Sequence, residues 1–543
     1  MDLNFIGACK QNRNKALLLA GAVVALLTFI AHSGSLSADF INYDDKAYLF
    51  ENTVIMQLDP ASILAMFTSS PAGWWMPLTW LSFAIDYQIW GLNPFGFHLT
   101  NTLIHAANSA LVVLVAATII RLREKVTAER RNQLVFAAIA GLLWSLHPLR
   151  VESVAWIAER KDVLNGLFAL LSIYYYMRFR SCQAEGCEPG RASLLSILFF
   201  YLSLGAKSVT VVLPVMLLAL DLYPLRRLTR GSFSARVTEK IPYFAVSGLV
   251  ILMTFATAAR NNFLVSYEMF PFSQRLAVSG NAIIEYLRLF LLPTGLSPLI
   301  LIPDPIPFSY TVKAIAALIL LVAVAISRSR WLQSCCLCCI LPLLPVLAFF
   351  QNGDQAFADH FTYLPAVAAS IAAAIAMLIL QHRLASGGRA LLLLAAGVLI
   401  AAYTLLSVRM FPVWRSTEAF WTRVIAVQPI ALNYKERGRN YHLDGRYQEA
   451  VADFTAAIES LPASLQPYRY NFYAFRAESF RLAGRYADAV RDFDAAIALL
   501  PHPVYYHHRG LALKALGRLA EAEQDFSLGG NISYPVVWFG REL

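Results

Sequence analysis

An acidic doublet, Asp44-Asp45, follows the first long apolar run of the chain by only a few residues. Adjacent carboxylates repel each other, and a membrane helix does not need them as an anchor, so the doublet suggests a functional site. The alternative is a solvated pair in a loop, because acidic residues in loops usually face water. The segments that surround the doublet decide between these two interpretations.

A second stretch that could do chemistry is 147–162, HPLRVESVAWIAERKD, where Arg150, Arg160 and Lys161 stand close together. Fixed guanidinium and ammonium groups beside carboxylates suit an anionic ligand, and a lipid-linked phosphate at a membrane surface is a natural candidate. The acids of the same stretch, which offer internal salt bridges as the alternative, are Glu152, Glu159 and Asp162.

Lys207 lies in the short segment Gly205-Ala206-Lys207-Ser208 between two apolar runs. This position predicts that Lys207 lies near the outer ends of two membrane helices. A lysine there can snorkel to the interface without a function, or it can contact a phosphate. Both interpretations stay open.

The apolar segment of about residues 97–120 carries four polar side chains on one helical face, because their spacings are three, four and three. They are His98, Asn101, His105 and Asn108. A polar stripe in lipid is costly unless it faces other helices. We therefore expect this stripe to serve helix packing through hydrogen bonds rather than direct catalysis.

Composition defines the class of protein to which these residues belong. The 543 residues are 58% apolar and 15% charged, and apolar runs near twenty residues recur, which predicts an all-α polytopic membrane helix bundle. The net charge of +10 is typical of cytoplasmic loops in such a protein, and no nucleic-acid-binding motif accompanies it. The basic start followed by a long apolar run predicts an uncleaved first helix over about 16–36.

The distribution of Lys and Arg among the loops predicts about 11 transmembrane helices within residues 1–408. In this topology Asp44-Asp45, the 147–162 stretch and the end of the chain lie on the outer face. The segment 281–293 is short and carries Asn281, Glu285 and Arg288 on one face. If the helix that follows runs inward, the segment 281–303 must start and end on the outer side. It is therefore predicted to form a re-entrant or interfacial hairpin.

The seven cysteines fall in predicted inner segments or inside one apolar helix. This distribution predicts unpaired thiols and no disulfide framework. Cys182 and Cys187 lack the second pair or histidine that a metal site needs. The four remaining cysteines of one apolar run suit helix packing: Cys335, Cys336, Cys338 and Cys339.

After Arg409 the apolar runs end and a repeated pattern of Tyr, Gly, Ala, Phe and Pro begins. Its spacing is that of a tetratricopeptide repeat, and three copies predict a C-terminal α-solenoid over 430–543. Residues 409–429 form a predicted coupling helix. The concave face of such a solenoid suits an extended peptide or a protein partner, and a scaffold that docks neighbouring proteins is the alternative.

The chain resembles the transmembrane and tetratricopeptide-repeat O-mannosyltransferases and their bacterial relatives, within the lipid-dependent glycosyltransferases of the type C fold. The resemblance covers nearly the whole chain and rests on long, ordered matches. These are Asn42-Tyr43-Asp44-Asp45 with Asn52, Pro77 to Trp80, Gly91 to Asn101, His147 to Asp162, Ala206-Lys207, and Ala358 to Pro365.

The resemblance implies inverting transfer of a sugar from a polyprenyl phosphate on the outer face. It implies that an acid of the first outer loop is the general base, with Asp44 the first choice and Asp45 the next. The cations that could stabilise the leaving phosphate are Arg160, Lys161, Lys207 and His360. The other candidates for the site are His98, His147, Glu152, Asp162, Glu285, Arg288 and Asp359.

The resemblance leaves metal dependence open, because some type C enzymes use a divalent metal and others do not. No cofactor is certain, and Mg²⁺ or Mn²⁺ is a candidate. The carboxylates that could supply oxygen ligands are Asp44, Asp45, Glu152, Asp162 and Asp359.

Two residues depart from the pattern of the family. Relatives usually carry Arg where His360 stands, so a phosphate contact there would depend on pH, since histidine is charged only near or below neutral pH. Met76 stands where His or Arg is frequent, and an apolar residue cannot bind phosphate. Either change could alter the choice of donor.

The sequence thus predicts a multi-pass glycosyltransferase of the inner membrane that moves a sugar from a polyprenyl phosphate carrier to a protein hydroxyl or glycan. The repeats would lie in the periplasm and present the acceptor. The partners are the lipid donor, a protein or peptide acceptor and the bilayer, and no nucleic acid is expected. The alternative is a non-catalytic membrane scaffold that recruits envelope or secreted proteins through its repeats. A lipid transporter is less favoured, since the polar groups cluster at one end of the bundle.

Overall fold

A computed structural model of the chain describes residues 3–124, 130–184, 186, 190–261, 265–349 and 355–530. Within these ranges the chain is built from helices, with one isolated β-bridge between Leu301 and Gln355. The prediction of an all-α fold is therefore confirmed for the described residues. The chain divides into two compact units. They are Met1–Leu296 with Leu301–Ser416, and Ser297–Ile300 with Thr417–Leu543.

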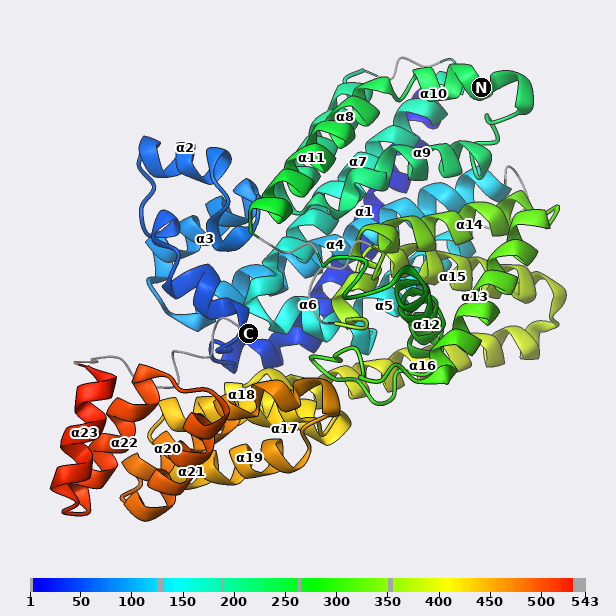
Figure 1. Cartoon of the computed structure of the whole chain (residues 1–543). Helices are drawn as coiled ribbons and strands as arrows, with labels where there is room; N and C mark the ends of the chain where they lie inside the picture. Colours follow the sequence, from blue (N-terminus) through cyan, green and yellow to red (C-terminus); the bar gives the residue numbers. More distant parts are fainter. Residues whose placement is uncertain are drawn as a thin grey trace. The chain divides into compact units, whose positions relative to one another are not determined.

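The first unit contains the apolar helices, which Figure 1 labels along the chain. Its longer helices are α1 (Leu3–His32), α3 (Pro77–Trp90), α4 (Pro94–Glu124), α5 (Arg130–Ser145), α7 (Arg160–Ala184), α8 (Ala192–Ala206), α9 (Leu213–Leu222), α11 (Ile241–Arg260), α12 (Phe272–Leu291), α13 (Phe308–Ile326), α14 (Arg330–Ile340), α15 (Pro365–Arg383) and α16 (Ser386–Met410). The shorter ones are α2 (Pro60–Thr68), α6 (Val151–Ala155) and α10 (Phe233–Thr238), together with the single turns η1 (Ser33–Ser37), η2 (Lys46–Phe50), η5 (Pro148–Arg150), η6 (Ile157–Glu159), η7 (Ser208–Val212), η10 (Asp359–Thr362) and η11 (Phe411–Trp414).

Six helices of the described residues are long and apolar enough to cross a membrane. They are Lys15–Ser37, Pro94–Arg123, Ile241–Arg260, Phe308–Ile326, Pro365–Arg383 and Ser386–Trp414. The bent pair Arg131–Ser145 and Pro148–Ala155, with 59° between its halves, makes a seventh if it is one span. Shorter apolar helices also occur, and the predicted count of 11 crossings stays a prediction.

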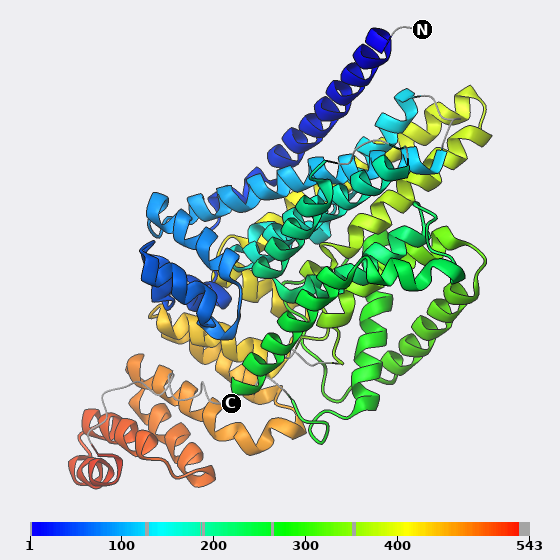
Figure 2. The same ribbon diagram turned by 90° about the horizontal axis from the view of Figure 1, so that it is seen from above.

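The polar stripe of α4 holds this helix against the 154–163 segment, where α6 and the start of α7 lie beside it (Figures 1 and 2). Asn108 Nδ2 donates to the carbonyl of Val163 at 2.8 Å, and Asn101 Nδ2 donates to the carbonyl of Trp156 at 3.3 Å. These bonds satisfy buried amides, as a polar group in an apolar bundle requires. The stripe therefore packs helices, as expected, and in doing so it positions residues 154–163.

The helix α12 differs from its prediction as a short segment that begins at residue 281. It runs from Phe272 to Leu291, twenty residues, and it is not among the six candidate spans. The predicted helix start, residue 281, is therefore nine residues too late. In the turns that the prediction left out, Arg275 is buried and donates to the carbonyls of Val265 at 2.6 Å and Phe270 at 2.8 Å, so its charge is satisfied by the backbone around the helix start.

The cysteines give one correction. Cys182, at the end of α7, is disulfide-bonded, so the prediction of an unpaired thiol is wrong at this position. The prediction used the expected compartment and not proximity in the fold, and proximity is what a disulfide requires. Cys187 lies outside the described residues. The four cysteines of the α14 run are free, as predicted.

Among its described residues, the second unit contains α17 (Thr417–Val427), then three helix pairs and the turn η12 (Ala463–Tyr468). The pairs are α18 (Ala431–Leu443) with α19 (Tyr447–Glu459), α20 (Arg469–Leu482) with α21 (Tyr486–Leu499), and α22 (Pro503–Ala515) with α23 (Leu519–Gly529). Each pair turns at a glycine with φ of 77°, namely Gly445, Gly484 and Gly517, and only glycine adopts this conformation without strain. Residues 531–543 of the predicted repeat domain lie outside the described residues.

One ion pair recurs in each helix pair and was not foreseen from the sequence. An arginine of the first helix forms a bidentate bond to an aspartate sixteen residues later on the second helix. The pairs are Arg437–Asp453, Arg476–Asp492 and Arg509–Asp525, with distances of 2.6–2.9 Å. A planar guanidinium fits a carboxylate in this way, and the aspartates are largely buried, so the bonds hold the two helices in register.

Loss of this ion pair should loosen one helix pair. We expect Asp492→Ala to leave the Arg476 guanidinium half-buried and unpaired, and to lower the local stability of α20 and α21 by about 2 kcal/mol. Hydrogen exchange of the full-length protein in detergent should then show roughly 30-fold faster opening of their amides. The matched control is Arg491→Ala, which removes an exposed ion pair to Asp488 within α21. Equal exchange in both variants would contradict a structural role for the recurring pair.

Candidate functional site

The two acids of the doublet have different surroundings. The carboxylate of Asp45 is buried and accepts backbone N–H bonds from Ile41 at 2.8 Å and from Ala158 at 2.9 Å. Asp44 is partly exposed, and its surroundings include the charges of Lys161 and Lys207. Asp45 therefore joins the segment that follows η1 to the 157–159 turn, while the side chain of Asp44 remains partly exposed.

Burial perturbs both carboxyls. It raises the pKa of Asp44 above its ordinary value, opposed by the ammonium groups of Lys161 and Lys207 and reinforced by the charge of Glu159. Burial also raises the pKa of Asp45, to about 7, against the two backbone N–H groups that favour its charged form. A carboxyl with a raised pKa is a stronger base than an ordinary aspartate once it is ionised.

Two lysines and two acids from two segments of the chain form a buried ion-pair network beside Asp44. Lys161 Nζ lies 2.7 Å from Glu159 Oε1, and Lys207 Nζ lies 2.6 Å from Asp162 Oδ1 and 3.5 Å from Glu159 Oε2. The turn η6 ends at Glu159 and α7 begins at Arg160, so the acids are on adjacent turns of one segment. Lys207 comes from the end of α8. Such paired charges neutralise one another and hold two ammonium groups in fixed positions.

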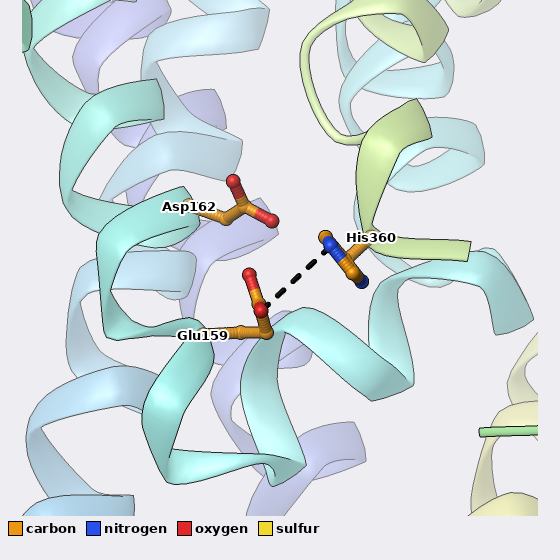
Figure 3. A group of neighbouring side chains, drawn as sticks. All are labelled: Glu159, Asp162 and His360. Carbon is orange, nitrogen blue, oxygen red and sulfur yellow. Dashed lines mark ion pairs between the residues drawn. The ribbon is translucent and has the colours of Figure 1, made fainter. Parts of the chain in front are cut away.

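His360 completes the cluster from η10, and Figure 3 shows its ring directed toward Glu159 and Asp162. Its Nδ1 lies 2.8 Å from Glu152 Oε1, and its Nε2 lies 3.7 Å from Glu159 Oε1. Burial lowers the pKa of His360 to about 3, so the ring is neutral at neutral pH. The pH-dependent phosphate contact expected at His360 stays a prediction. A neutral ring whose Nδ1–H donates to Glu152 turns the lone pair of Nε2 toward Glu159.

Arg160 faces a different set of partners from its neighbour Lys161. Its guanidinium is fully buried, pairs with Asp86 at 2.7 Å, and donates to the carbonyl of Phe97 at 2.8 Å. It also donates to Asn101 Oδ1 of α4. These bonds join α3, α4 and α7, so the donors of Arg160 are used within the fold and not at the cluster.

Other sequence candidates lie apart from this cluster or border it. Both ring nitrogens of His147 are engaged, one accepting from the Leu149 N–H at 3.2 Å and the other donating to the Phe290 carbonyl at 3.0 Å. Glu285 pairs with Arg288 at 2.7 Å and with Lys313 at 2.5 Å, joining α12 to α13.

His98 and Asp359 are both buried. His98 belongs to α4. Asp359 begins η10 next to His360, and its carboxyl interacts electrostatically with Arg150 and Arg288. Met76 is buried at the start of α3. Of the candidates, the structure thus brings together Asp44, Lys161, Lys207, Asp162 and His360, with Glu152 behind the ring.

Two acids that matter for this arrangement were not among the candidates. Glu159 was considered only as a salt-bridge partner, yet it contacts both lysines and faces His360. Asp86 is the counterion of the buried Arg160. A signal for Asp86 existed, since it is the only charged residue in the helix Pro77–Trp90, and a lone charge in an apolar helix requires a partner.

The chain is related in sequence to protein O-mannosyltransferases. It is 32% identical over 169 residues to the protein O-mannosyl-transferase Tmtc1 of Drosophila melanogaster, covering 30% of this chain and 18% of the relative. It is 31% identical over 194 residues to TMTC4 of Homo sapiens, covering 33% and 26%, and 26% identical over 316 residues to TMTC2 of Homo sapiens, covering 55% and 36%. The resemblance inferred from the motifs is thereby confirmed. The chain matches between about a fifth and a third of the length of these relatives.

No protein-family model matches the chain. Among solved structures, the crystal structure of ArnT from Cupriavidus metallidurans bound to undecaprenyl phosphate aligns with 94% of this chain and 76% of that chain, at 13% identity and a TM-score of 0.31. At this TM-score the alignment does not show that the two folds are the same.

The contrast within the doublet makes a prediction about stability. We expect Asp45→Ala to lower the free energy of unfolding by about 2 kcal/mol, because two buried N–H groups lose their acceptor. Asp44→Ala, which removes no side-chain hydrogen bond to a described residue, should leave the midpoint of thermal unfolding near that of the unmodified protein. The measurement is thermal unfolding of both full-length variants in the same detergent. Similar midpoints for the two variants would contradict the structural role of Asp45.

Proposed function

We propose that the protein transfers a sugar from a polyprenyl phosphate carrier to a hydroxyl of a protein or glycan at the outer face of a membrane. The observation that carries this proposal is the convergence of Asp44, Lys161 and Lys207 from three distant parts of the chain. A carboxyl with a raised pKa next to two fixed ammonium groups suits attack of a hydroxyl on a sugar phosphate. The sequence relation to protein O-mannosyltransferases supports the same chemistry.

In this mechanism Asp44 is the general base. An acceptor hydroxyl is a weak nucleophile, and Asp44 removes its proton as the oxygen attacks the anomeric carbon. The bond to the phosphate oxygen breaks on the opposite side of the sugar, so the configuration inverts. Asp45 acts as a positioning residue, since its bonds to Ile41 and Ala158 fix the backbone next to Asp44.

The departing phosphate gains charge, and the ammonium groups of Lys161 and Lys207 stabilise it. Both are held by carboxylates before the donor arrives, so little reorganisation is needed during the reaction. The ring of Phe361 lies 5.7 Å from Lys207 Nζ and limits the directions from which water reaches this ammonium group.

The three helix pairs of the second unit are proposed to be a tetratricopeptide-repeat solenoid that presents the acceptor. The recurring glycine turns and Arg–Asp pairs support this interpretation. The proposed organisation keeps a type C membrane domain over 1–408 with about 11 crossings, a coupling helix over 409–429 and the repeats over 430–543. The repeats would lie in the periplasm of a bacterial inner membrane.

Replacement of the base tests the proposal. We expect Asp44→Asn to reduce sugar transfer by about 10²–10⁴-fold, because the amide accepts no proton. The measurement is consumption of each member of a panel of polyprenyl phosphate sugars by the purified full-length protein, scored by mass spectrometry. The unmodified protein should lose activity as the pH falls through a value above that of an ordinary aspartate, since burial raises the pKa of Asp44.

The control for this experiment is Glu51→Gln, which neutralises an exposed acid of the same outer segment. It should transfer sugar at the unmodified rate. Full activity of Asp44→Asn would remove Asp44 as the base. If no donor is consumed by the unmodified protein with any acceptor, the non-catalytic scaffold replaces the enzyme as the better account.

Removal of one ammonium group should weaken donor binding and leaving-group stabilisation together. We expect Lys207→Met to lower kcat/KM for the lipid donor about 10²-fold, with partial recovery in Lys207→Arg, which keeps the charge. Steady-state kinetics on the donor identified above provide the measurement, after thermal unfolding has checked that both variants fold. An unchanged kcat/KM in Lys207→Met would exclude a contact with the donor phosphate.

A further inference from the structure

Glu159, Asp162 and His360 offer three ligand atoms that lie within 4.8 Å of one another (Figure 3). All three side chains are more than nine-tenths buried. When Glu159 and Asp162 are both ionised, Asp162 Oδ2 receives no hydrogen bond from a described residue, and the described partner of Glu159 Oε2 is Lys207 Nζ, 3.5 Å away. Buried carboxylate oxygens without donors are costly, and a cation bound between them would remove that cost.

Glu152 holds the imidazole in the orientation that metal binding requires. It accepts a bond from Nδ1 of His360 at 2.8 Å, and its other oxygen accepts the backbone N–H of His360 at 3.1 Å. The Nε2 atom is then left with a lone pair directed at Glu159, 3.7 Å away and too far for a hydrogen bond. A carboxylate behind a histidine is the usual outer partner of a metal-binding imidazole.

The charge of the cluster points the same way. The carboxyls of Glu152, Glu159, Asp162 and Asp359 act on one another, and the described cations that oppose them include Lys161, Lys207 and the buried Arg150. A cation bound among these buried carboxylates would reduce their mutual repulsion. Asp162, Lys207 and His360 also line one small pocket.

We propose that Glu159, Asp162 and His360 bind one divalent transition-metal ion, with Glu152 as the residue that orients His360. A set of one imidazole and two carboxylates suits Mn²⁺ or Zn²⁺ better than Mg²⁺ or Ca²⁺, which favour oxygen ligands alone. The proposal that this ion binds does not depend on the proposed function. The role of the ion, to attract the phosphate of the lipid donor beside Lys207, rests on the proposed function.

The test is metal binding by the full-length protein in detergent, after the metal has been removed with EDTA. We expect one Mn²⁺ or Zn²⁺ per chain by mass spectrometry of the metals after dialysis. Pulsed electron paramagnetic resonance of the Mn²⁺ form should show coupling to a histidine nitrogen. Less than one tenth of an equivalent of either metal, or bound Mn²⁺ without nitrogen coupling, would overturn the proposal.

Variants assign the ligands. We expect Glu152→Gln to weaken Mn²⁺ binding about 10–100-fold, and Glu159→Gln and His360→Gln to weaken it by at least as much. The matched control is Asp221→Asn, another buried acid that pairs with a lysine, Lys240, at 2.5 Å. Asp221 contacts Tyr176, fourteen residues and about 21 Å along α7 from Asp162, so its loss should leave Mn²⁺ affinity unchanged. Equal affinities in all four variants would remove the site.

The same samples distinguish this site from the proposed function. Nitrogen-coupled Mn²⁺ in a protein that consumes no donor would keep the metal site and reject sugar transfer. Full donor consumption by a metal-free protein that binds no Mn²⁺ would keep sugar transfer and reject the site.

Discussion

The first unit depends on one constraint, which is that charged side chains buried among membrane helices need partners. Three ion pairs meet this need, and each is almost wholly removed from solvent. They are Arg160–Asp86, Lys161–Glu159 and Lys207–Asp162. Removing one member of such a pair leaves an uncompensated buried charge, at a cost of about 3–5 kcal/mol. Two of these pairs join different helices, since Arg160 of α7 meets Asp86 of α3 and Lys207 follows α8. The charges that surround the candidate site are therefore also what holds its helices together.

Because buried charges both hold the helices together and surround the candidate site, the cations Arg160, Lys161 and Lys207 fall into two groups. Arg160 is enclosed by Asp86, Asn101 and the Phe97 carbonyl, a set that uses the planar fork of the guanidinium within the fold. Lys161 and Lys207 are compact charges that contact carboxylates at one side. Adjacent residues in the sequence thus carry a structural charge and a charge that faces the cluster. No pattern of residue types separates Arg160 from Lys161, because the difference comes from which neighbours each side chain meets.

Local patterns predicted much of the fold and part of the site. The apolar runs gave the long helices, and the spacing of small and aromatic residues gave the three helix pairs, because both signals act within one or two helices. The errors concern which side chains pair. At the start of α12 the buried Arg275 is satisfied by backbone carbonyls such as that of Val265, and the disulfide of Cys182 depends on proximity and not on compartment. The Arg437–Asp453 type of pair was overlooked, although its sixteen-residue spacing recurs visibly in the sequence.

The two acids of the doublet are adjacent in the sequence but have different surroundings in the structure. Asp44 and Asp45 are both helical, so their side chains leave the backbone about 100° apart. One direction leads to the N–H groups of Ile41 and Ala158, and the other leads toward the lysines. The backbone N–H groups of Ile41 and Ala158 oppose the effect of burial on the pKa of Asp45, and the ammonium groups of Lys161 and Lys207 oppose it for Asp44. Two adjacent acids are thus each favoured in their charged form by a different set of partners.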